Sequence, residues 1–520
     1  MLKCKQSNII NIDDLNINRF DLKINDKINP NESCSKNRDK HNLKESSSIS
    51  VGALKFEELS SKNAEKLKLL SQKCPYLLAC YSAGQLLMWK DFYNASFATI
   101  SGCVVIKLTI NKQEQFLFPF AYEENADINE ALTKVEKYAS KNYIPYSFFA
   151  VPRSEISSVV ARYTNVSFSV NRNASDYIYL STDMQNFIGK KYSGQRNHIN
   201  KFKKLYPDAV FRELNDQDND KKKLQKFWGK YENDFNKTMP LAKLELEYSK
   251  EVFSSLKSGT DYMACIELDD EIISVCYGEK CGDVLIIHIE KSLNDFDGVY
   301  QFMVNNFAKN YGDDCKYINR EDDAGNRGLR ISKIQYKPLK IEEKISAQIN
   351  SELTMLKELP KISTDNLTIE IIEEKETELY NKLCLDDNHN KYWGYDYHEH
   401  MEGQPPYDYF YKGAKTDFEN RVSLTMAIRY NGNFIGEAVI CEFDFRGNAN
   451  LGIRILPEYT GKGFGNEAFS ALVSYAIYEL GLSGVTAYCY KQNIPSFKML
   501  SSCMVLIKED DKYYYFKQTT

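Results

Sequence analysis

The pattern of hydrophobic and polar positions divides the chain into a polar N-terminal segment and three mixed segments. Residues 1–50 are rich in Asn, Lys, Asp and Ser and end in "KESSSIS". Such a segment cannot bury enough apolar surface to offset the entropy of ordering, so we expect a disordered, flexible polar tail. From Leu54 onward apolar residues recur at helix and strand periods, which predicts folded structure.

The first folded segment, predicted at 51–173, mixes helices and strands. Helical spacing of Leu67, Leu70 and Cys74 marks a helix in "FEELSSKNAEKLKLLSQKC". Two strands are predicted in "ATISGCVVIKLTI" and "QEQFLFPFAY", and a second helix in "INEALTKVEKYASKN". A buried strand follows in "YIPYSFFAVP" and ends at Pro152.

The next segments repeat this alternation. At 174–345 we predict strands in "YIYLS", in "DYMACIELDDEIISVCYGEKCGDVLIIHIE" and in "CKYINRE", with helices before and between them. The Lys- and Glu-rich residues that follow suggest a connecting helix and a linker, placed at 346–365. Residues 366–520 form a third mixed unit. The predicted fold class is α/β (α+β), with three units of similar size.

Bulk properties narrow the class of protein. The chain has 520 residues, of which 27% are charged, and a net charge of −5, which argues against general coating of nucleic acid but leaves room for a local basic patch. No apolar run reaches the roughly 20 residues that span a bilayer, and the start "MLKCKQSNIINIDD" lacks the apolar core of a signal peptide. We expect a cytoplasmic protein without a transmembrane segment.

Cysteines and histidines give no metal motif. The 13 cysteines are scattered without a CxxC pair, and the 6 histidines form no HExxH. We predict reduced, mostly buried thiols and no bound metal.

A glycine turn in "LGIRILPEYTGKGFGNEAFSALVSYAIYEL" is the strongest candidate for ligand binding. It does not fit the P-loop pattern, and Asn466 stands where the dinucleotide fingerprint requires glycine. Three alternating glycines and the start of a helix, predicted from Gly465 to Leu480, would expose amides to an anion. A glycine-rich corner without a ligand fits these residues equally well.

The residues around this turn resemble the core of the GNAT acetyltransferases, especially the ribosomal-protein-acetyltransferase-like branch. The family's loop pattern, R/Q-x-x-G-x-G/A, falls on Thr460, Gly463 and Gly465. The resemblance implies a GNAT, or acyl-CoA N-acyltransferase, fold with acetyl-CoA or another acyl-CoA as co-substrate. Its pyrophosphate would bind the loop amides, which come from Thr460, Gly461, Lys462, Gly463, Phe464 and Gly465.

The same resemblance assigns further roles. It implies that the N–H of Ile455 polarises the thioester carbonyl and that Asn493 holds the pantetheine arm. The chain departs from the family pattern at Thr460, where Arg or Gln is usual, and at Leu500, where many members carry a tyrosine acid.

Acidic and aromatic residues could form the acceptor side. Glu437, Glu442 and Asp444 lie in "GEAVICEFDF", and Glu442 and Asp444 would share one strand face, so that one of them could act as the base through a water. Trp393 and Tyr395 could wall the site, with Asp396 or Glu399 attracting a cationic amine. The alternatives are a solvated strand face and an aromatic surface loop.

Two stretches of the second segment are charged. "GKKYSGQRNHINKF" could contact the phosphates of RNA or of an anionic lipid headgroup, or could be a solvated helix. "YINREDDAGNRGLRISKIQYKP" is dense in both signs of charge around two glycines, which suggests a pocket rim held by ion pairs.

With "LLMWKDFYNASFA" upstream, these stretches resemble the family related to the C-terminal domain of phosphatidylglycerol lysyltransferase, over residues 54 to 340. The resemblance implies two GNAT-like folds in tandem, as in enzymes that use aminoacyl-tRNA. It makes Arg196 and Lys201 phosphate-contact candidates. The pocket candidates that it implies are Glu321, Asp322, Arg330 and Lys333.

Three hypotheses follow. The last third of the chain could be an acetyl-CoA-dependent N-acetyltransferase for a small-molecule or peptide amine. The tandem could transfer an aminoacyl group from tRNA to phosphatidylglycerol or a small acceptor. Alternatively, the tandem could be a non-catalytic module that binds a substrate or RNA.

Overall fold

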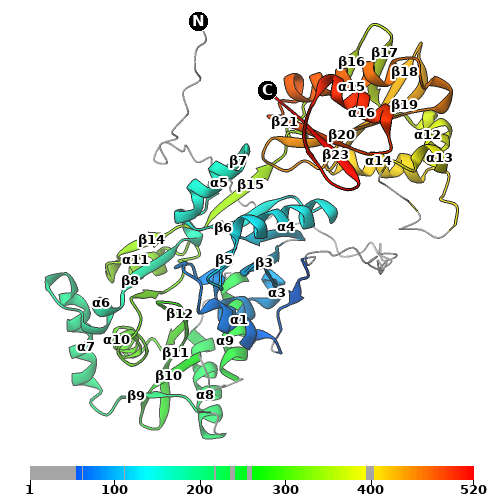
Figure 1. The fold of residues 1–520 in the computed structure, drawn as a ribbon. Helices are drawn as coiled ribbons and strands as arrows, with labels where there is room; N and C mark the ends of the chain where they lie inside the picture. Colours follow the sequence, from blue (N-terminus) through cyan, green and yellow to red (C-terminus); the bar gives the residue numbers. More distant parts are fainter. Residues whose placement is uncertain are drawn as a thin grey trace, which may run out of the picture. The chain divides into compact units, whose positions relative to one another are not determined.

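The fold was analysed on a computed structural model that describes residues 54–60, 62–110, 112–215, 218–234, 240–254, 261–393, 397 and 403–520. The polar tail predicted at 1–50 lies outside these residues. Three mixed sheets, each packed with helices, make up the described chain (Figure 1). The predicted α/β class with three mixed units is therefore confirmed.

The first sheet has the order β1-β2-β3-β4-β6-β15-β7, with β5 paired to β3. Its strands are β1 (Glu57–Glu58), β2 (Ser96–Ile100), β3 (Cys103–Ile110), β4 (Gln113–Leu117), β5 (Phe120–Ala121), β6 (Ser147–Val151), β7 (Asn165–Val170) and β15 (Ile345–Asn350). Its helices are α1 (Ala64–Ser71), α2 (Ala83–Met88), α3 (Lys90–Tyr93), α4 (Ile128–Lys141) and α5 (Ile156–Arg162).

Strand β15 corrects the predicted boundary and the predicted connecting helix. It follows the second sheet in the chain, yet it pairs antiparallel with both β6 and β7 in the first sheet. Its apolar residues alternate with polar ones, and Ile345, Ala347 and Ile349 are buried. The linker assigned to 346–365 therefore begins with a core strand, because the Lys- and Glu-rich composition belongs to the residues on either side of it.

The second sheet has the order β14-β8-β13-β12-β11-β10-β9. Its strands are β8 (Asp176–Leu180), β9 (Val210–Glu213), β10 (Asp261–Leu268), β11 (Glu271–Cys281), β12 (Val284–Ser292), β13 (Tyr317–Asn319) and β14 (Lys340–Glu342). Its helices are α6 (Ser181–Asn186), α7 (Ser193–Leu205), α8 (Asp218–Asp234), α9 (Pro240–Ser254), α10 (Val299–Tyr311) and α11 (Arg327–Gln335).

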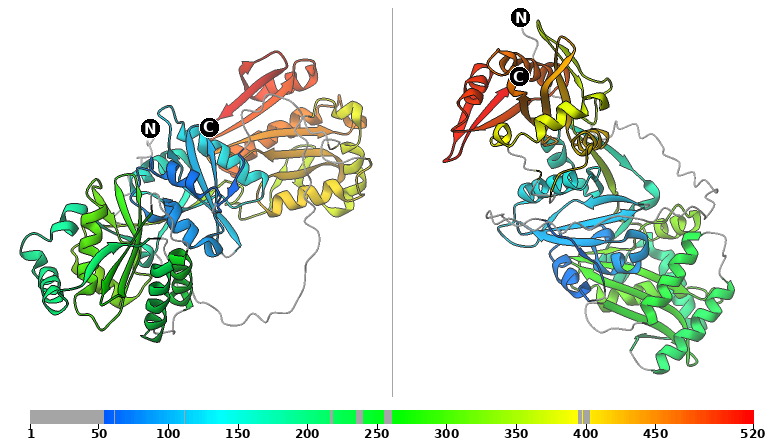
Figure 2. Two further views of the ribbon diagram at one scale, coloured as in Figure 1. Left: turned by 90° about the horizontal axis from the view of Figure 1, so that it is seen from below. Right: turned by 90° about the vertical axis from the view of Figure 1, so that its right-hand side faces the viewer.

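The third sheet has the order β16-β17-β18-β19-β20-β21-β23-β22, with helices on both faces (Figure 2). Its strands are β16 (Lys361–Ser363), β17 (Leu367–Ile371), β18 (Leu424–Tyr430), β19 (Asn433–Cys441), β20 (Asn448–Ile455), β21 (Gly484–Tyr490), β22 (Val505–Glu509) and β23 (Tyr513–Thr519). Its helices are α12 (Thr377–Cys384), α13 (Asp387–Asn390), α14 (Tyr409–Glu419), α15 (Phe464–Ser474) and α16 (Ile494–Cys503), with a π-helical turn at Tyr475–Glu479.

Each of the three sheets contains the same type of strand–helix–strand connection. In each, a central strand leads through a helix to a parallel neighbour, as β4–α4–β6, β12–α10–β13 and β20–α15–β21. The remaining pairings are antiparallel. Each crossover helix therefore follows the C-terminal end of a central strand, with the short strand β5 between β4 and α4 in the first sheet.

The described residues contain no helix that is long and apolar enough to cross a membrane. Over the same residues, no cluster of His, Cys, Asp and Glu side chains has the arrangement of a metal site.

Candidate functional site

The first feature of the site is an opening between β20 and β21. These parallel strands pair only over Asn448–Asn450 and Gly484–Thr486, and the rest of β20 has no partner on that side. The N–H of Leu456 donates to Ile435 O at 2.8 Å, on the β19 side. Because successive amides of a strand point to opposite sides, the N–H of Ile455 faces the opening. The Ile455 side chain is buried, so the backbone is the part of Ile455 that a ligand would meet.

The glycine loop lies at the end of β20. A short turn at Pro457–Tyr459 leads to Gly461 and Gly463, which have φ angles of +75° and +88°. A Cβ atom at either position would meet no atom within 4 Å. Positive φ without a crowding neighbour is the condition under which glycine keeps the backbone open to a ligand.

The start of α15 supplies free amides. Gly463 is its N-cap and offers no side-chain cap, and in the described chain no protein acceptor receives the amides of residues 461–466. These N–H groups and the positive end of the helix dipole face the same loop. The inner face of this helix carries Ala468 and Leu472, is continued by Ala476 in the π-helical turn, and is buried.

Thr460 differs from the expectation. Its amide and its hydroxyl both donate to the carbonyl of Pro457, at 3.2 and 2.8 Å. The turn at Pro457–Tyr459 uses both donors, so the free amides of the loop begin at Gly461. Lys462 lies with its Nζ 5.1 Å from the ring centre of Tyr459, beside the loop.

Asn493 and Leu500 border the opening from α16. The Asn493 side chain caps this helix by accepting from Ser496 N at 3.2 Å, which leaves its amide nitrogen as a donor. Leu500 is buried in the core and carries no proton to donate.

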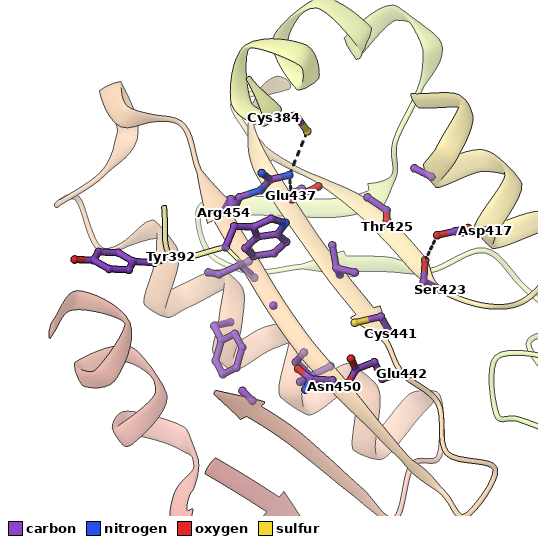
Figure 3. A pocket seen from close by; sticks show the side chains of 18 of the residues that line it. Cys384, Tyr392, Asp417, Ser423, Thr425, Glu437, Cys441, Glu442, Asn450 and Arg454 are labelled. Atoms are coloured by element: carbon purple, nitrogen blue, oxygen red, sulfur yellow. Dashed lines mark hydrogen bonds and ion pairs between the residues drawn. The ribbon is translucent and has the colours of Figure 1, made fainter. Parts of the chain in front are cut away.

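The predicted acceptor side is one face of β19 and β20, from which alternate side chains line the cavity (Figure 3). The register pairs Glu437 with Arg454, Val439 with Gly452 and Cys441 with Asn450. All six residues line the same cavity as the glycine loop.

Glu437 is not free to act as a base. Its carboxylate accepts from Arg454 Nε at 2.5 Å, and both side chains are buried. Arg454 also donates to Cys384 Sγ at 3.2 Å (Figure 3). A further bond joins Arg454 to Asn390 Oδ1 at 2.7 Å. The ring of Trp393 covers the guanidinium at 4.4 Å. The Glu437–Arg454 pair therefore has partners for its charged groups and acts as a structural element beside the site.

Trp393 lies on β20. A Cβ atom at Gly452 would come within 3.0 Å of its ring, so the glycine makes room for the indole on the acceptor face. Trp393 lines the cavity, and its role as a wall of the acceptor site stays a prediction. Tyr395, Asp396 and Glu399 lie outside the described residues.

Glu442 and Asp444 do not share a strand face, because β19 ends at Cys441 and Glu442 has a φ angle of +54°. Asp444 accepts from the amides of Arg446 and Asn448, both at 2.9 Å, and so stabilises the loop. Glu442 lines the cavity without a hydrogen bond or ion pair to the described chain (Figure 3).

Tyr488 is a candidate that the sequence did not reveal. It lies on β21, lines the same cavity and is 41% exposed. Burial raises the pKa of its phenol, and the charge of Glu442 raises it further. The phenol therefore keeps its proton at neutral pH and can donate it. Only the pairing of strands distant in sequence brings it beside Glu442.

In the second sheet the predicted phosphate contacts have local partners. Lys201 forms an ion pair with Asp297, and Arg196 donates to the carbonyls of Phe187 and Gly189. Their charges stabilise α7 and the loop before it.

The four pocket candidates of the second sheet do come together. Glu321 accepts from His288 at 2.6 Å, and Asp322 pairs with Lys344 at 3.2 Å. Lys333 donates to the carbonyls of Arg320, at 2.6 Å, and of Asp322. Burial lowers the pKa of Lys333, and the charge of Arg320 lowers it further.

Arg330 lies at the same rim and pairs with Asp323 at 2.9 Å.

His288 is the centre of this buried charge cluster, and it was missed because it lies in an apolar strand. It sits between Glu279, at 2.9 Å, and Glu321. Burial alone would lower the pKa of His288, but its hydrogen bonds to the two carboxylates and their charges raise the pKa to about 10. Glu279 also accepts from Gly84 N at 2.7 Å, which ties the cluster to α2.

At the N-terminal ends of the other two described crossover helices, protein groups occupy the space that is open before α15. Before α10, a Cβ atom at Gly298 would lie 2.4 Å from the carbonyl oxygen of His198, so the backbone of α7 occupies that corner. Asp127 caps α4 with its own carboxylate by accepting from Glu130 N at 2.9 Å. Of the three described crossover helices, α15 alone begins at an open glycine loop.

Comparison with protein families gives two matches. Residues 79–348 match the family described as phosphatidylglycerol lysyltransferase, C-terminal, and residues 366–503 match the acetyltransferase (GNAT) domain.

Two curated relatives are similar over part of their length. An uncharacterized protein of Mycoplasmoides gallisepticum is 24% identical over 169 residues, which are 32% of this chain and 54% of that protein. The uncharacterized N-acetyltransferase YnaD of Bacillus subtilis is 27% identical over 86 residues, 16% of this chain and 51% of that protein. The chain thus spans about half the length of the curated relatives it matches.

Among solved structures, a conserved protein of unknown function from Bacteroides thetaiotaomicron is similar with a TM-score of 0.51 and 26% identity, over 56% of this chain and 99% of that chain. A spermidine N-acetyltransferase from Vibrio cholerae, solved with CoA and spermine, has a TM-score of 0.27 and 17% identity, over 30% of this chain and 96% of that chain.

Proposed function

The chain belongs to the phosphatidylglycerol lysyltransferase C-terminal family and carries a GNAT acetyltransferase domain C-terminal to the region that matches this family. We propose that the protein is an acyltransferase and that its C-terminal domain acylates a primary amine. The donor is acetyl-CoA or another acyl-CoA.

One observation carries this proposal: an open glycine loop at the start of α15 adjoins the opening between β20 and β21. In the proposed pose the pyrophosphate binds the amides of residues 461–466, where free N–H groups and the helix dipole favour an anion. The pantetheine arm extends into the opening, and Ile455 N–H binds the thioester oxygen, where negative charge develops.

The proposed reaction needs one base and one acid. The amine nitrogen attacks the thioester carbon, the C–S bond breaks, and the sulfur leaves with the bonding electrons. Glu442, which has no protein partner in the described chain, accepts the proton lost by the amine, directly or through a water. Tyr488 donates a proton to the leaving sulfur, in place of the acid missing at Leu500.

Calorimetric titration of the full chain with CoA tests the donor site. We expect Gly463→Val to lower the affinity at least about tenfold, because the side chain would project into the cradle at a φ of +88°. Gly432→Val is the matched control, since Gly432 has a φ of +79°, equally open surroundings and a place in the turn between β18 and β19. Equal loss in both variants, or no CoA binding by the unmodified chain, would contradict the proposal.

We propose a second function for the first two sheets, the predicted tandem. Protein groups occupy the space at the N-terminal ends of α4 and α10, and a buried charge cluster surrounds His288. The filled corners disfavour acyl-CoA as its donor. We propose that the tandem transfers an aminoacyl group from aminoacyl-tRNA to phosphatidylglycerol or to a small acceptor.

Transfer of a labelled amino acid from charged tRNA to a lipid extract measures this second activity. We expect His288→Gln to abolish the transfer and to leave CoA binding unchanged. If the tandem binds the same tRNA or lipid but never transfers the label, the tandem is a binding module instead.

A further inference from the structure

Helix α11 exposes apolar side chains. None of its nine residues is buried, and Leu329, Ile331 and Ile334 are 46, 48 and 44% exposed. Leu339, just after the helix, is 52% exposed. The helix lies beside β14 at the edge of the second sheet (Figure 1). Several large apolar side chains on one short helix are unusual for a surface that faces only water.

Helical spacing places Ile331 and Ile334 together on one exposed face of α11. Arg327, Ile331 and Ile334 follow one another at i, i+4 and i+7, so they share a face. The inner face carries Lys333, whose Nζ is hydrogen-bonded inside the cluster described above, and is followed by the buried Tyr336.

The loop before α7 contributes another exposed apolar residue. Ile188 is 72% exposed. Gln195 Nε2 donates to Gln335 O at 2.8 Å, and the rings of Phe187 and Tyr336 lie 6.0 Å apart. These contacts bring the loop that contains Ile188 to the C-terminal end of α11.

Basic residues outnumber acidic ones around these side chains, although Lys191, Lys201 and Lys340 form ion pairs with neighbouring carboxylates. Residues 187–207 contain six basic and no acidic residues, and residues 324–341 contain five basic and no acidic residues, in a chain whose net charge is −5. Lys190, Arg327 and Lys337 form no ion pair in the described chain. Their charges are therefore available to an external anion.

We propose that this surface, which we call the α11 surface, docks on an anionic lipid bilayer. It consists of Ile188, Lys190, Arg327, Ile331, Ile334, Lys337 and Leu339. Apolar side chains would enter the boundary between headgroups and acyl chains, while the basic residues bind the lipid phosphates. The helix lies on the membrane rather than across it.

The charge decides between possible occupants. A second copy of this chain would place one basic surface against another, which disfavours self-association through this face. RNA would satisfy the basic residues but would leave the isoleucines without an apolar partner. An anionic bilayer satisfies both.

Co-sedimentation of the full chain with lipid vesicles tests the proposal. We expect binding to phosphatidylcholine vesicles that contain phosphatidylglycerol, weaker binding as salt is added, and little binding to phosphatidylcholine alone. Lys190→Gln combined with Lys337→Gln is expected to lower binding about 25-fold, at about fivefold for each charge near the surface. Ile331→Ser combined with Ile334→Ser is expected to lower binding at least about tenfold.

The matched control lies on β22. Val505→Ser with Ile507→Ser removes two apolar side chains that are 64 and 57% exposed, but acidic residues follow them at Glu509 and Asp510. This variant should bind vesicles normally. All variants should also bind CoA normally, which separates this test from that of the acyl donor site, and the circular dichroism spectra of the α11-surface variants should match that of the natural chain.

Several outcomes would overturn the proposal. They are equal binding to vesicles with and without phosphatidylglycerol, equal loss in the β22 control, and unchanged binding in both α11-surface variants. Displacement of the vesicles by RNA together with tight RNA binding of the isoleucine variant would reassign the surface to nucleic acid.

Discussion

At the scale of single residues, the partners of a charge decide what it can do. Glu437 and Glu442 are five positions apart, but Glu437 is locked to Arg454 and Glu442 faces the cavity without a partner in the described chain. Buried and paired carboxylates stabilise the fold, whereas an unpaired carboxylate beside a reacting amine can take its proton. The two residues therefore call for opposite predictions.

Glu442→Gln should lower kcat by about a hundredfold or more, because general-base catalysis contributes roughly 10²–10⁴-fold. CoA affinity should not change, since Glu442 is not part of the cradle. Steady-state kinetics with an amine acceptor, together with calorimetry, measure both quantities. Unchanged kcat would exclude Glu442 as the base.

Glu437→Gln should instead destabilise the protein by about 3–5 kcal/mol, because it leaves the buried Arg454 guanidinium without its counter-charge. Chemical denaturation measures the loss. A stable variant with low kcat would reverse the two assignments.

His288 predicts a pH dependence of stability. Its pKa is raised to about 10 in the folded protein, against about 6.5 when unfolded. Its protonated form therefore stabilises the fold fully below about pH 6.5, and this contribution is lost as pH rises toward 10. Denaturation at several pH values should show a steeper decline for the natural chain than for His288→Gln. Parallel curves would mean that the imidazole is neutral between its carboxylates.

At the scale of elements, the register between β19 and β20 shapes the acceptor side. Gly452 leaves room for Trp393 on the strand. Gly452→Val should displace the indole and raise the KM for the amine several-fold, while CoA affinity stays the same. The displacement should appear as a change in tryptophan fluorescence that is absent in the Trp393→Phe background. A shift in CoA affinity alone would place Trp393 on the donor side.

The helices and strands also show which structural features could be predicted from the sequence. The residue pattern predicted a helix from Gly465 to Leu480, where α15 begins, and the spacing of the glycines identified the loop, because these features depend on neighbouring residues. β15 was missed because its partners, β6 and β7, lie far away in the chain. The roles of Thr460 and Asp444 depend on hydrogen bonds inside turns, which the residue pattern does not reveal. The proximity of Tyr488 to Glu442 depends on strand pairing and could not be deduced from the pattern either.

At the scale of the whole molecule, three sheets use the same crossover, but their crossover helices begin differently. A carboxylate caps α4, the backbone of α7 fills the corner before α10, and the corner before α15 is open. The same type of connection thus leads to one open glycine loop, the proposed acyl-CoA cradle, and to two corners that are occupied by protein groups. Activity with two kinds of donor would follow from this division.

The number of CoA molecules bound by each chain tests this division. We expect calorimetry of the full chain to give one site, because a pyrophosphate needs several free amides, and of the three crossover helices that the structure describes, only α15 begins at a loop that supplies them. Gly463→Val should weaken that site without revealing another. A stoichiometry of two or three, or tight binding that survives Gly463→Val, would mean that α7 or Asp127 withdraws to admit the ligand. In that case the tandem would itself be a CoA-dependent enzyme, and the filled corners would be closed states of working sites.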